Sequence, residues 1–211
     1  MDSPVKDLPA SILVIEDHPL TRHGLVACLE DTGRFSIAGT AGSLDEGRRF
    51  ITDAPGLPDI IILDILLGGE NGLKFIDFLK EFREIHGLNM PAVLVCSVFE
   101  DPFRIRTALQ MGAAGYISKS AGEEELLRAI DTVLSGKEFV DPRLKFIISR
   151  APGVYGKFTR REREILTLVK QNYTNQRIAR ELAISLRTVE NHISHIYLKT
   201  NTSTRQELME F

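Results

Sequence analysis

Hydrophobic residues in the first two thirds of the chain gather in short continuous runs. The runs cover residues 11–15, 35–40, 59–63, 92–97 and 116–118. Between and after them lie stretches with apolar residues at helical spacing, near residues 19–31, 44–53, 72–85, 102–111 and 123–135. Strands that are apolar at successive positions are covered on both faces, which is typical of parallel sheets flanked by helices. The pattern therefore predicts an α/β domain over residues 10–135, with a doubly wound five-stranded parallel sheet.

The last quarter of the chain has a purely helical pattern. Thr159 and Glu162 are spaced as a capping box, and Thr174 and Ser185 are placed to cap two further helices. A short helix, a brief turn and a longer helix predict an all-α helix-turn-helix domain over residues 157–211. Residues 136–156 have no clean period, and we interpret them as a linker with one short helix near 144–150.

Polar side chains stand at the ends of four predicted strands. Glu16 and Asp17 follow the first strand, Asp64 follows the third, Ser97 ends the fourth and Lys119 follows the fifth. Doubly wound sheets bind ligands beyond the carboxyl ends of their strands. We therefore expect these five groups to converge on one crevice.

Three carboxylates in one crevice need a cation, because two of them about 4 Å apart repel by roughly 4 kcal/mol at an effective dielectric near 20. Hard oxygen ligands favour Mg²⁺ over zinc, since the pattern includes no His or Cys ligand. Asp64 is then a candidate nucleophile toward a phosphoryl group, with Lys119 and Ser97 contacting the phosphoryl oxygens. Each residue alone also has an ordinary interpretation as a helix cap or a solvated charge, and only their joint placement favours a site.

Four segments resemble the receiver domain of two-component response regulators. They are "VIEDH" at 14–18, "IIILDILL" at 60–67 with Gly72, "VCS" at 95–97 and "GAAGYISK" at 112–119. The resemblance implies the CheY-like strand order 2-1-3-4-5 and a sensor histidine kinase that phosphorylates Asp64. It also implies Mg²⁺ bound by Glu16, Asp17, Asp64 and the backbone carbonyl of Leu66. The implied switch consists of Ser97, whose hydroxyl moves toward the phosphate, and Tyr116, whose ring turns inward. The segment "LLGGENG" departs from the family, which often has a proline after the aspartate.

The longer helix of the C-terminal domain has a polar face opposite its apolar stripe. Side chains of these types can read base edges, and they are Arg187, Thr188, Glu190, Asn191, Ser194 and His195. Basic residues suited to phosphates are Lys199, Arg205, Arg160 and Arg161. Residues 157–211 hold ten Lys and Arg against six Asp and Glu, whereas the rest of the chain is acidic overall. A solvated helix face is the alternative, and without the fold context we would favour it.

Three segments, "TRREREIL", "TNQRIA" and "TVENHISHIY", are similar to the LuxR-type DNA-binding domain, also called NarL/FixJ. This similarity implies double-stranded promoter DNA as a partner and homodimers on inverted half-sites. The family generally has a longer fourth helix for dimerisation than the chain has before Phe211. Asn172 and Asn201 stand at turn positions where glycine is common, and Thr200 and Thr202 replace residues that are usually apolar.

Composition narrows the remaining classes of protein. The two cysteines, Cys28 and Cys96, lie in apolar runs, which argues against a disulfide framework. There is no signal-peptide core and no apolar stretch of the roughly 20 residues that a membrane span needs, so we expect a cytoplasmic protein without membrane contact.

Together these features favour a transcription factor that is controlled by phosphorylation and catalyses only its own phosphoryl transfer and dephosphorylation. We expect the unphosphorylated receiver to mask residues 187–195. The same architecture with a phosphorylation-independent receiver remains an alternative. A haloacid-dehalogenase phosphatase would need an acid where Leu66 stands, and a quorum-sensing regulator would not need the acid cluster.

Overall fold

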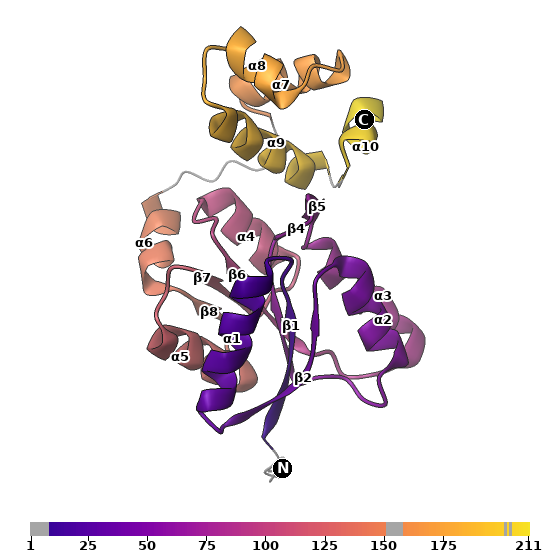
Figure 1. Cartoon of the computed structure of the whole chain (residues 1–211), viewed down its shortest axis with the longest axis vertical. Coiled ribbons are helices and arrows are strands. Elements are labelled where there is room, and N and C mark those ends of the chain that lie inside the picture. The colour runs from indigo at the N-terminus through magenta and orange to yellow at the C-terminus, as the bar shows by residue number, and fades with distance from the viewer. Residues whose placement is uncertain (1–8, 151–157, 201, 203) are drawn as a thin grey trace.

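The computed structural model describes residues 9–150, 158–200, 202 and 204–211. A six-stranded parallel sheet forms the centre of the larger part of the molecule (Figure 1). Its strands are β1 (Ala10–Ile15), β2 (Phe35–Ala41), β3 (Ile60–Leu63), β6 (Ala92–Ser97), β7 (Gly115–Ser118) and β8 (Phe139–Val140). The order is β2-β1-β3-β6-β7-β8, so the five predicted strands have the expected order and β8 is added at one edge.

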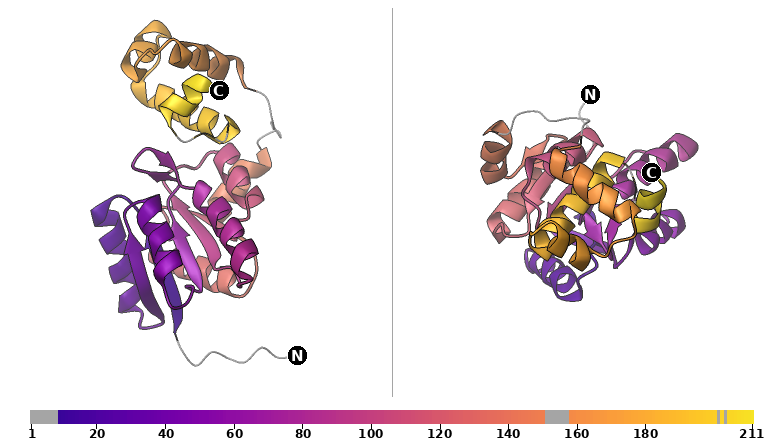
Figure 2. Two further views of the ribbon diagram at one scale, coloured as in Figure 1. Left: turned by 90° about the vertical axis from the view of Figure 1, so that its right-hand side faces the viewer. Right: turned by 90° about the horizontal axis from the view of Figure 1, so that it is seen from above.

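Helices cover both faces of this sheet, as the continuous apolar runs predict (Figure 2). One core contains the inward side chains of α1 (Pro19–Asp31) and α5 (Glu123–Leu134). The other contains those of α2 (Leu44–Asp53), α3 (Lys74–His86) and α4 (Pro102–Gln110). Each helix lies within two residues of its predicted ends, and the carboxyl ends of the strands point toward the C-terminal helices.

Much of the predicted linker packs against the α/β part. Strand β8 pairs with β7, and α6 (Pro142–Arg150) follows it directly. Phe139 and Leu144 are buried in the two sheet cores, and Arg106 donates a hydrogen bond to the carbonyl of Ile148 (2.6 Å). The short helix predicted near 144–150 is present, but residues 139–150 extend the α/β part instead of separating it from the next domain.

A small hairpin follows Asp64 and was not predicted. It pairs β4 (Leu66–Leu67) with β5 (Glu70–Asn71). Its two loop residues, Gly68 and Gly69, have φ values of 59° and 91°, which a two-residue hairpin turn of this kind demands and glycine adopts without strain. The glycines of "LLGGENG" therefore shape the loop in which the family often has a proline.

Gly72 lies so close to the Asp64 backbone that no side chain fits. An added Cβ would lie 2.0 Å from the Asp64 carbonyl oxygen. We expect Gly72→Ala to lower the free energy of unfolding by about 2–4 kcal/mol, because the backbone beside Asp64 must shift. Gly56→Ala is the matched control, since an added Cβ there meets nothing within 4 Å. Urea denaturation would measure both, and equal midpoints for the two variants would contradict the expectation.

Among its described residues the C-terminal domain has four helices, and their caps lie where the sequence predicts helix starts. They are α7 (Arg160–Lys170), α8 (Asn175–Glu181), α9 (Leu186–Thr200) and α10 (Arg205–Glu210). Thr159 and Glu162 form the capping box, Thr174 caps α8, and the Ser185 hydroxyl accepts a hydrogen bond from the backbone of Thr188. Their apolar faces enclose a separate core that includes Ile165, Ile178, Val189, Ile196 and Leu208.

The polar residues by which this domain differs from the LuxR-type pattern make local contacts where the structure describes them. Asn172 has φ 60°, the left-handed conformation expected of it, whereas Asn201 lies outside the described residues. Thr200 donates a hydrogen bond to the Ile196 carbonyl (2.8 Å), and its hydroxyl lies 2.8 Å from that of Thr202. These hydrogen bonds satisfy the hydroxyls that stand where the family usually has apolar side chains.

Glu162 is a buried acid that joins α7 to α9. Its Oε2 atom accepts hydrogen bonds from the Lys199 ammonium (2.6 Å) and the Thr159 backbone (2.6 Å). Burial alone would raise the pKa of Glu162, but these partners outweigh burial and the pKa is lowered. A lowered pKa in the folded state means that the pair stabilises the domain at neutral pH and that this stabilisation is lost as the pH falls through the lowered value.

We expect Glu162→Gln to lower the free energy of unfolding of the C-terminal domain by about 1–3 kcal/mol at neutral pH, because the buried ammonium loses its counter-charge. The difference from the wild type should shrink in acid. Glu164→Gln is the control, since Glu164 pairs with Arg160 and Arg161 at the surface, and its loss should change nothing measurable. Denaturation followed across a pH series would test both variants, and a Glu162→Gln effect that stays constant down to acid pH would contradict the charge argument.

Candidate functional site

An acidic cluster lies at the carboxyl ends of β1 and β3. One ligand atom from each of Glu16, Asp17, His18 and Asp64 lies within 4.8 Å of the others. Glu16 and Asp64 are 1% and 5% exposed, whereas Asp17 is half-buried and accepts a hydrogen bond from the Gly68 backbone (2.8 Å). The predicted convergence of these carboxylates is therefore present in the structure.

Lys119 lies between two of the carboxylates. Its Nζ atom is 2.6 Å from Asp64 Oδ2 and also forms an ion pair with Glu16. Burial alone would lower the pKa of Lys119, but the hydrogen bonds to Asp64 and Glu16 outweigh it and raise the pKa. Burial also raises the pKa of Asp64, and Lys119 only partly opposes this effect. One ammonium among three carboxylates leaves excess negative charge, so the hard oxygen donors fit a divalent cation such as Mg²⁺.

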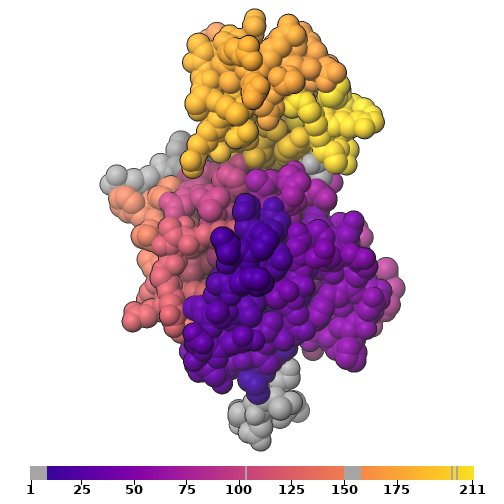
Figure 3. Space-filling model, in the orientation of Figure 1, coloured from indigo at the N-terminus to yellow at the C-terminus, as the bar shows by residue number. Residues whose placement is uncertain are grey.

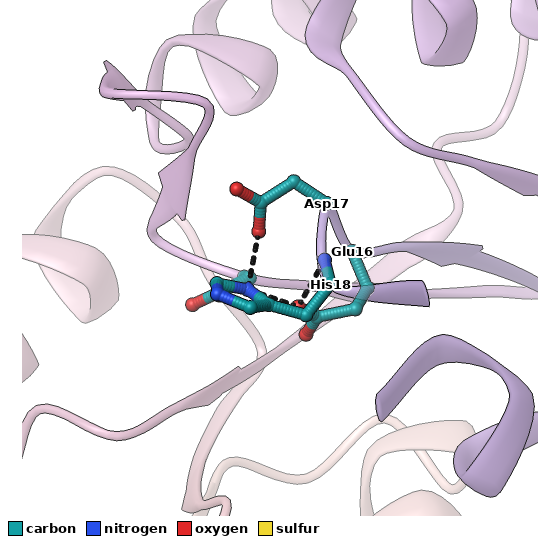
Figure 4. Close-up of side chains that lie close together, drawn as sticks. Glu16, Asp17 and His18 are labelled. Carbon is teal, nitrogen blue, oxygen red and sulfur yellow. Dashed lines mark hydrogen bonds and ion pairs between the residues drawn. The ribbon is translucent and has the colours of Figure 1, made fainter. Parts of the chain in front are cut away.

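His18 belongs to the cluster, and the sequence interpretation missed it. Its Nδ1 atom is 2.8 Å from Asp17 Oδ1 and 3.2 Å from Glu16 Oε1, as Figure 4 illustrates. The negative charge of Asp17 raises the pKa of His18. The prediction that no histidine accompanies the carboxylates was therefore wrong, and the signal was present, because His18 directly follows Asp17 in the chain.

Ser97 and Tyr116 lie on the neighbouring strands β6 and β7, where Tyr116 pairs with Val95 and Ser97 pairs with Ser118. Both are fully buried, and the Ser97 hydroxyl accepts a hydrogen bond from the Phe99 backbone (3.4 Å). The Tyr116 hydroxyl donates to the Phe99 carbonyl (2.6 Å). The ring is therefore already turned inward, whereas the resemblance implied that it turns inward on phosphorylation. Leu66 begins β4, and the role of its backbone carbonyl stays a prediction.

The C-terminal domain packs against the α/β part (Figure 3), at the end toward which the strands run (Figure 1). Helix α9 contacts α4, and the His195 Nε2 atom lies 3.0 Å from Asp101 Oδ1. A second ion pair crosses the boundary between Lys74 and Glu207 (3.6 Å). A cleft of about 890 Å³ lies between the domains, lined by Glu100 and Asp101 on one side and by Arg187, Asn191 and Arg205 on the other. The polar face of α9 thus points toward the receiver-like part.

Asp101 and Arg104, at the start of α4, were not predicted as part of any site. Asp101 caps α4 through the Arg104 backbone (3.0 Å) and pairs with the Arg104 guanidinium (3.2 Å). Burial alone would raise the pKa of Asp101, but His195 and Arg104 outweigh it and lower the pKa. Arg104 is 1% exposed, lies 3.5 Å from the centroid of the Phe99 ring, and has its pKa lowered by burial. The cap and the pair with Arg104 are local, whereas the contact of Asp101 with His195 depends on how the two domains pack, so no sequence signal marks it.

The candidate DNA-reading residues differ in how they are presented. Arg187, Glu190 and Asn191 are exposed, whereas Ser194 and His195 are half-buried beside the receiver-like part. The hydroxyl of Thr188 lies 2.7 Å from that of Ser185 at the start of α9.

The basic residues expected to contact phosphates are largely engaged inside the C-terminal domain. Lys199 binds Glu162 and Arg205 donates to Asn175 (2.9 Å). Arg160 and Arg161 pair with Glu164 (3.1 and 2.8 Å). Of these four, Arg160 is the most open to solvent, with a side chain 91% exposed.

No helix among the described residues is both long and apolar enough to cross a membrane. Residues 12–131 match the family model of the response regulator receiver domain, and residues 157–211 match that of bacterial regulatory proteins of the luxR family.

Relatives match almost the whole chain. The protein is 31% identical over 207 residues to the nitrate/nitrite response regulator protein NarL of Escherichia coli strain K12. The alignment covers 94% of this chain and 93% of that protein. The protein is 30% identical over 215 residues to the oxygen regulatory protein NreC of Staphylococcus epidermidis strain ATCC 12228, covering 95% of each.

Solved structures share the fold. A LuxR-family two-component response regulator from Aurantimonas sp. SI85-9A1 has a TM-score of 0.59 at 25% identity, covering 67% of this chain and 96% of that one. An RcsB structure has a TM-score of 0.60 at 18% identity, covering 96% and 97%. With both domain models matched and relatives that align along almost the whole chain, the protein belongs to the NarL/FixJ family of response regulators and is a phosphorylation-regulated DNA-binding transcription factor.

Proposed function

We propose that Asp64 accepts a phosphoryl group from a sensor histidine kinase. The observation that carries this proposal is the buried Asp64 carboxylate held by Lys119 at the carboxyl edge of the sheet. An Asp64 carboxylate oxygen attacks phosphorus, the P–O bond of the acyl phosphate forms, and the bond to the donor breaks. The Lys119 ammonium then neutralises a phosphoryl oxygen, and the Ser97 hydroxyl donates a hydrogen bond to another.

Mg²⁺ is the cation that the cluster fits. Glu16, Asp17, Asp64 and the backbone carbonyl of Leu66 would hold it, and it would neutralise charge that develops on the phosphoryl group. Lys119 supplies one positive charge to the same carboxylates. The protein catalyses no reaction beyond this phosphoryl transfer and the later hydrolysis of the acyl phosphate, which releases inorganic phosphate.

Phosphorylation acts on the contact between α4 and α9. In the arrangement described, His195 faces Asp101 and the polar side of α9 borders the interdomain cleft. Double-stranded DNA and the receiver therefore compete for residues 187–195. The phosphoryl group carries about two negative charges and replaces the single charge of the Asp64 carboxylate beside the loop that begins at Ser97. This change biases the receiver toward a form that releases α9.

The released helix reads promoter DNA as part of a homodimer in the cytoplasm. Arg187, Thr188, Glu190, Asn191, Ser194 and His195 would contact base edges, and Lys199 would contact phosphates once its pairing with Glu162 relaxes. Solved RcsB structures that share this fold contain dimers bound to DNA, which supports the same assembly for this chain.

The experiment combines phosphorylation with DNA binding. The chain would be incubated with Mg²⁺ and acetyl phosphate, and intact mass would give the phosphorylated fraction. Affinity would then be measured for a duplex selected from random DNA by the fragment 150–211. We expect one adduct, tighter DNA binding by the phosphorylated chain, and the tightest binding by the fragment. Equal affinity of the fragment and the unphosphorylated chain would rule out masking, and a folded chain without adduct would favour a phosphorylation-independent receiver.

A further inference from the structure

The loop between β6 and α4 touches both functional parts of the molecule through two adjacent acids. Glu100 turns toward the segment that carries Lys119, and Asp101 turns toward α9. A shift of the backbone at one of these residues is passed to the other, because one planar peptide unit joins them. A signalling role for this pair of acids rests on the proposed function, in which Asp64 is phosphorylated and α9 is released.

Glu100 is tied to both neighbours of Lys119. Its Oε1 atom accepts hydrogen bonds from the hydroxyls of Ser118 (2.6 Å) and Ser120 (3.2 Å). The Ser118 hydroxyl in turn accepts from the Ser120 backbone (3.1 Å). We call Glu100, Ser118 and Ser120 the Glu100 clasp. Hydrogen bonds to a carboxylate are stronger than neutral ones, so the clasp couples the loop to the segment around Lys119.

Lys119, at the centre of this segment, senses the state of Asp64 directly. Its ammonium lies 2.6 Å from Asp64 Oδ2, and the chain on either side is held to Glu100. A phosphoryl group on Asp64 places new anionic oxygens farther from the backbone of β3 than the carboxylate itself. The ammonium must follow these oxygens to keep its charge paired, and Ser118 and Ser120 are its immediate neighbours.

At the other end of the loop, Asp101 has three partners. It caps α4 through the Arg104 backbone (3.0 Å), pairs with the Arg104 guanidinium (3.2 Å) and lies 3.0 Å from the His195 ring. The contact with His195 is therefore sensitive to where the loop holds Asp101. The attraction between the Asp101 carboxylate and the His195 ring weakens as the distance between them grows.

We infer that the Glu100 clasp transmits the phosphorylation state of Asp64 to α9, with Glu100 as the positioning residue that presents Asp101 to His195. The clasp acts beside the switch formed by Ser97 and Tyr116 and does not need those side chains to move. This assignment fits the position of Tyr116, because its ring is already buried and cannot turn further inward.

The test measures coupling, defined as the ratio of DNA affinities of the phosphorylated and unphosphorylated chain. Glu100→Ala removes the clasp, and we expect it to reduce this ratio at least threefold while the phosphorylated fraction measured by intact mass stays at the wild-type value. Glu100→Gln keeps an oxygen that accepts from both serines and should restore most of the ratio. Glu124→Ala, an exposed glutamate at the start of α5, is the control and should leave the ratio unchanged.

A double variant tests whether the two acids form one route. If Glu100 acts through Asp101, then Glu100→Ala combined with Asp101→Asn should give the same ratio as Asp101→Asn alone. Additive effects, or a Glu100→Ala ratio equal to that of the wild type at full phosphorylation, would overturn the inference and leave the proposed function intact. A wild-type chain that is phosphorylated without any change in DNA affinity would instead overturn the proposed function, and the inference with it.

Discussion

Asp64→Asn abolishes the phosphoryl adduct that the wild-type chain forms with acetyl phosphate and Mg²⁺. The amide has almost the same shape as the carboxylate but lacks the anionic oxygen that attacks phosphorus. Intact mass spectrometry of the two proteins side by side measures the effect. Asp45→Asn, an exposed acid at the start of α2, is the matched control and forms the adduct at the wild-type level. An adduct on Asp64→Asn would mean that another residue is the acceptor.

Asp64→Asn should preserve or raise the stability of the fold although it abolishes phosphorylation. A lost adduct can therefore be told apart from a lost fold. Burial raises the pKa of Asp64, so the folded state binds a proton there more readily than the unfolded chain does. A raised carboxyl pKa means that the ionised group costs folding free energy at neutral pH, and the cost disappears as the pH falls below the ordinary value. In magnesium-free buffer we therefore expect Asp64→Asn to unfold at a temperature equal to or above that of the wild type.

Asp101→Asn should make the unphosphorylated chain bind DNA about five times more tightly, because loss of a contact of about 1 kcal/mol between Asp101 and His195 weakens the closed arrangement. Asparagine still caps α4, so the helix start is retained. The variant leaves every candidate DNA-contacting side chain in place, which makes the affinity itself a direct measure of masking.

Lys74→Gln is the control for this experiment, because it removes an ion pair with Glu207 that also crosses the domain boundary, at 3.6 Å and between side chains that are 27% and 46% exposed. We expect less than a twofold change in DNA affinity for it. If Asp101→Asn also changed affinity by less than twofold, the contact between Asp101 and His195 would not limit DNA binding.

The sequence predicted the strands of the receiver and the helices of both domains because their physical signals are local. Continuous apolar runs mark buried parallel strands, and the capping residues Thr159 and Thr174 mark helix starts within a few residues. Strand β8 is two residues long and is paired only through β7, so no periodicity could reveal it. The hairpin beside Asp64 was missed because the glycine pair was interpreted as a loop.

The candidate site residues at strand ends could be predicted from the sequence, whereas those at the contact between the domains could not. Glu16, Asp64 and Lys119 follow strand ends, and the topology of a doubly wound sheet brings such positions together. The roles of Glu100 and Asp101 depend on which loop meets which helix of another domain. Lys199 was expected to face DNA phosphates, yet its ammonium is paired with a buried acid that lies 37 residues earlier in the chain.

The contact between α4 and α9 makes DNA an effector of the receiver. Thermodynamic linkage is reciprocal, so if phosphorylation strengthens DNA binding by some factor, bound DNA must stabilise the phosphorylated receiver by the same factor. An operator that draws His195 away from Asp101 therefore favours the acyl phosphate on the molecules that occupy it. At a fixed kinase activity, a larger fraction of the DNA-bound molecules is then phosphorylated than of the unbound molecules. DNA binding therefore favours the phosphorylated state that strengthens DNA binding.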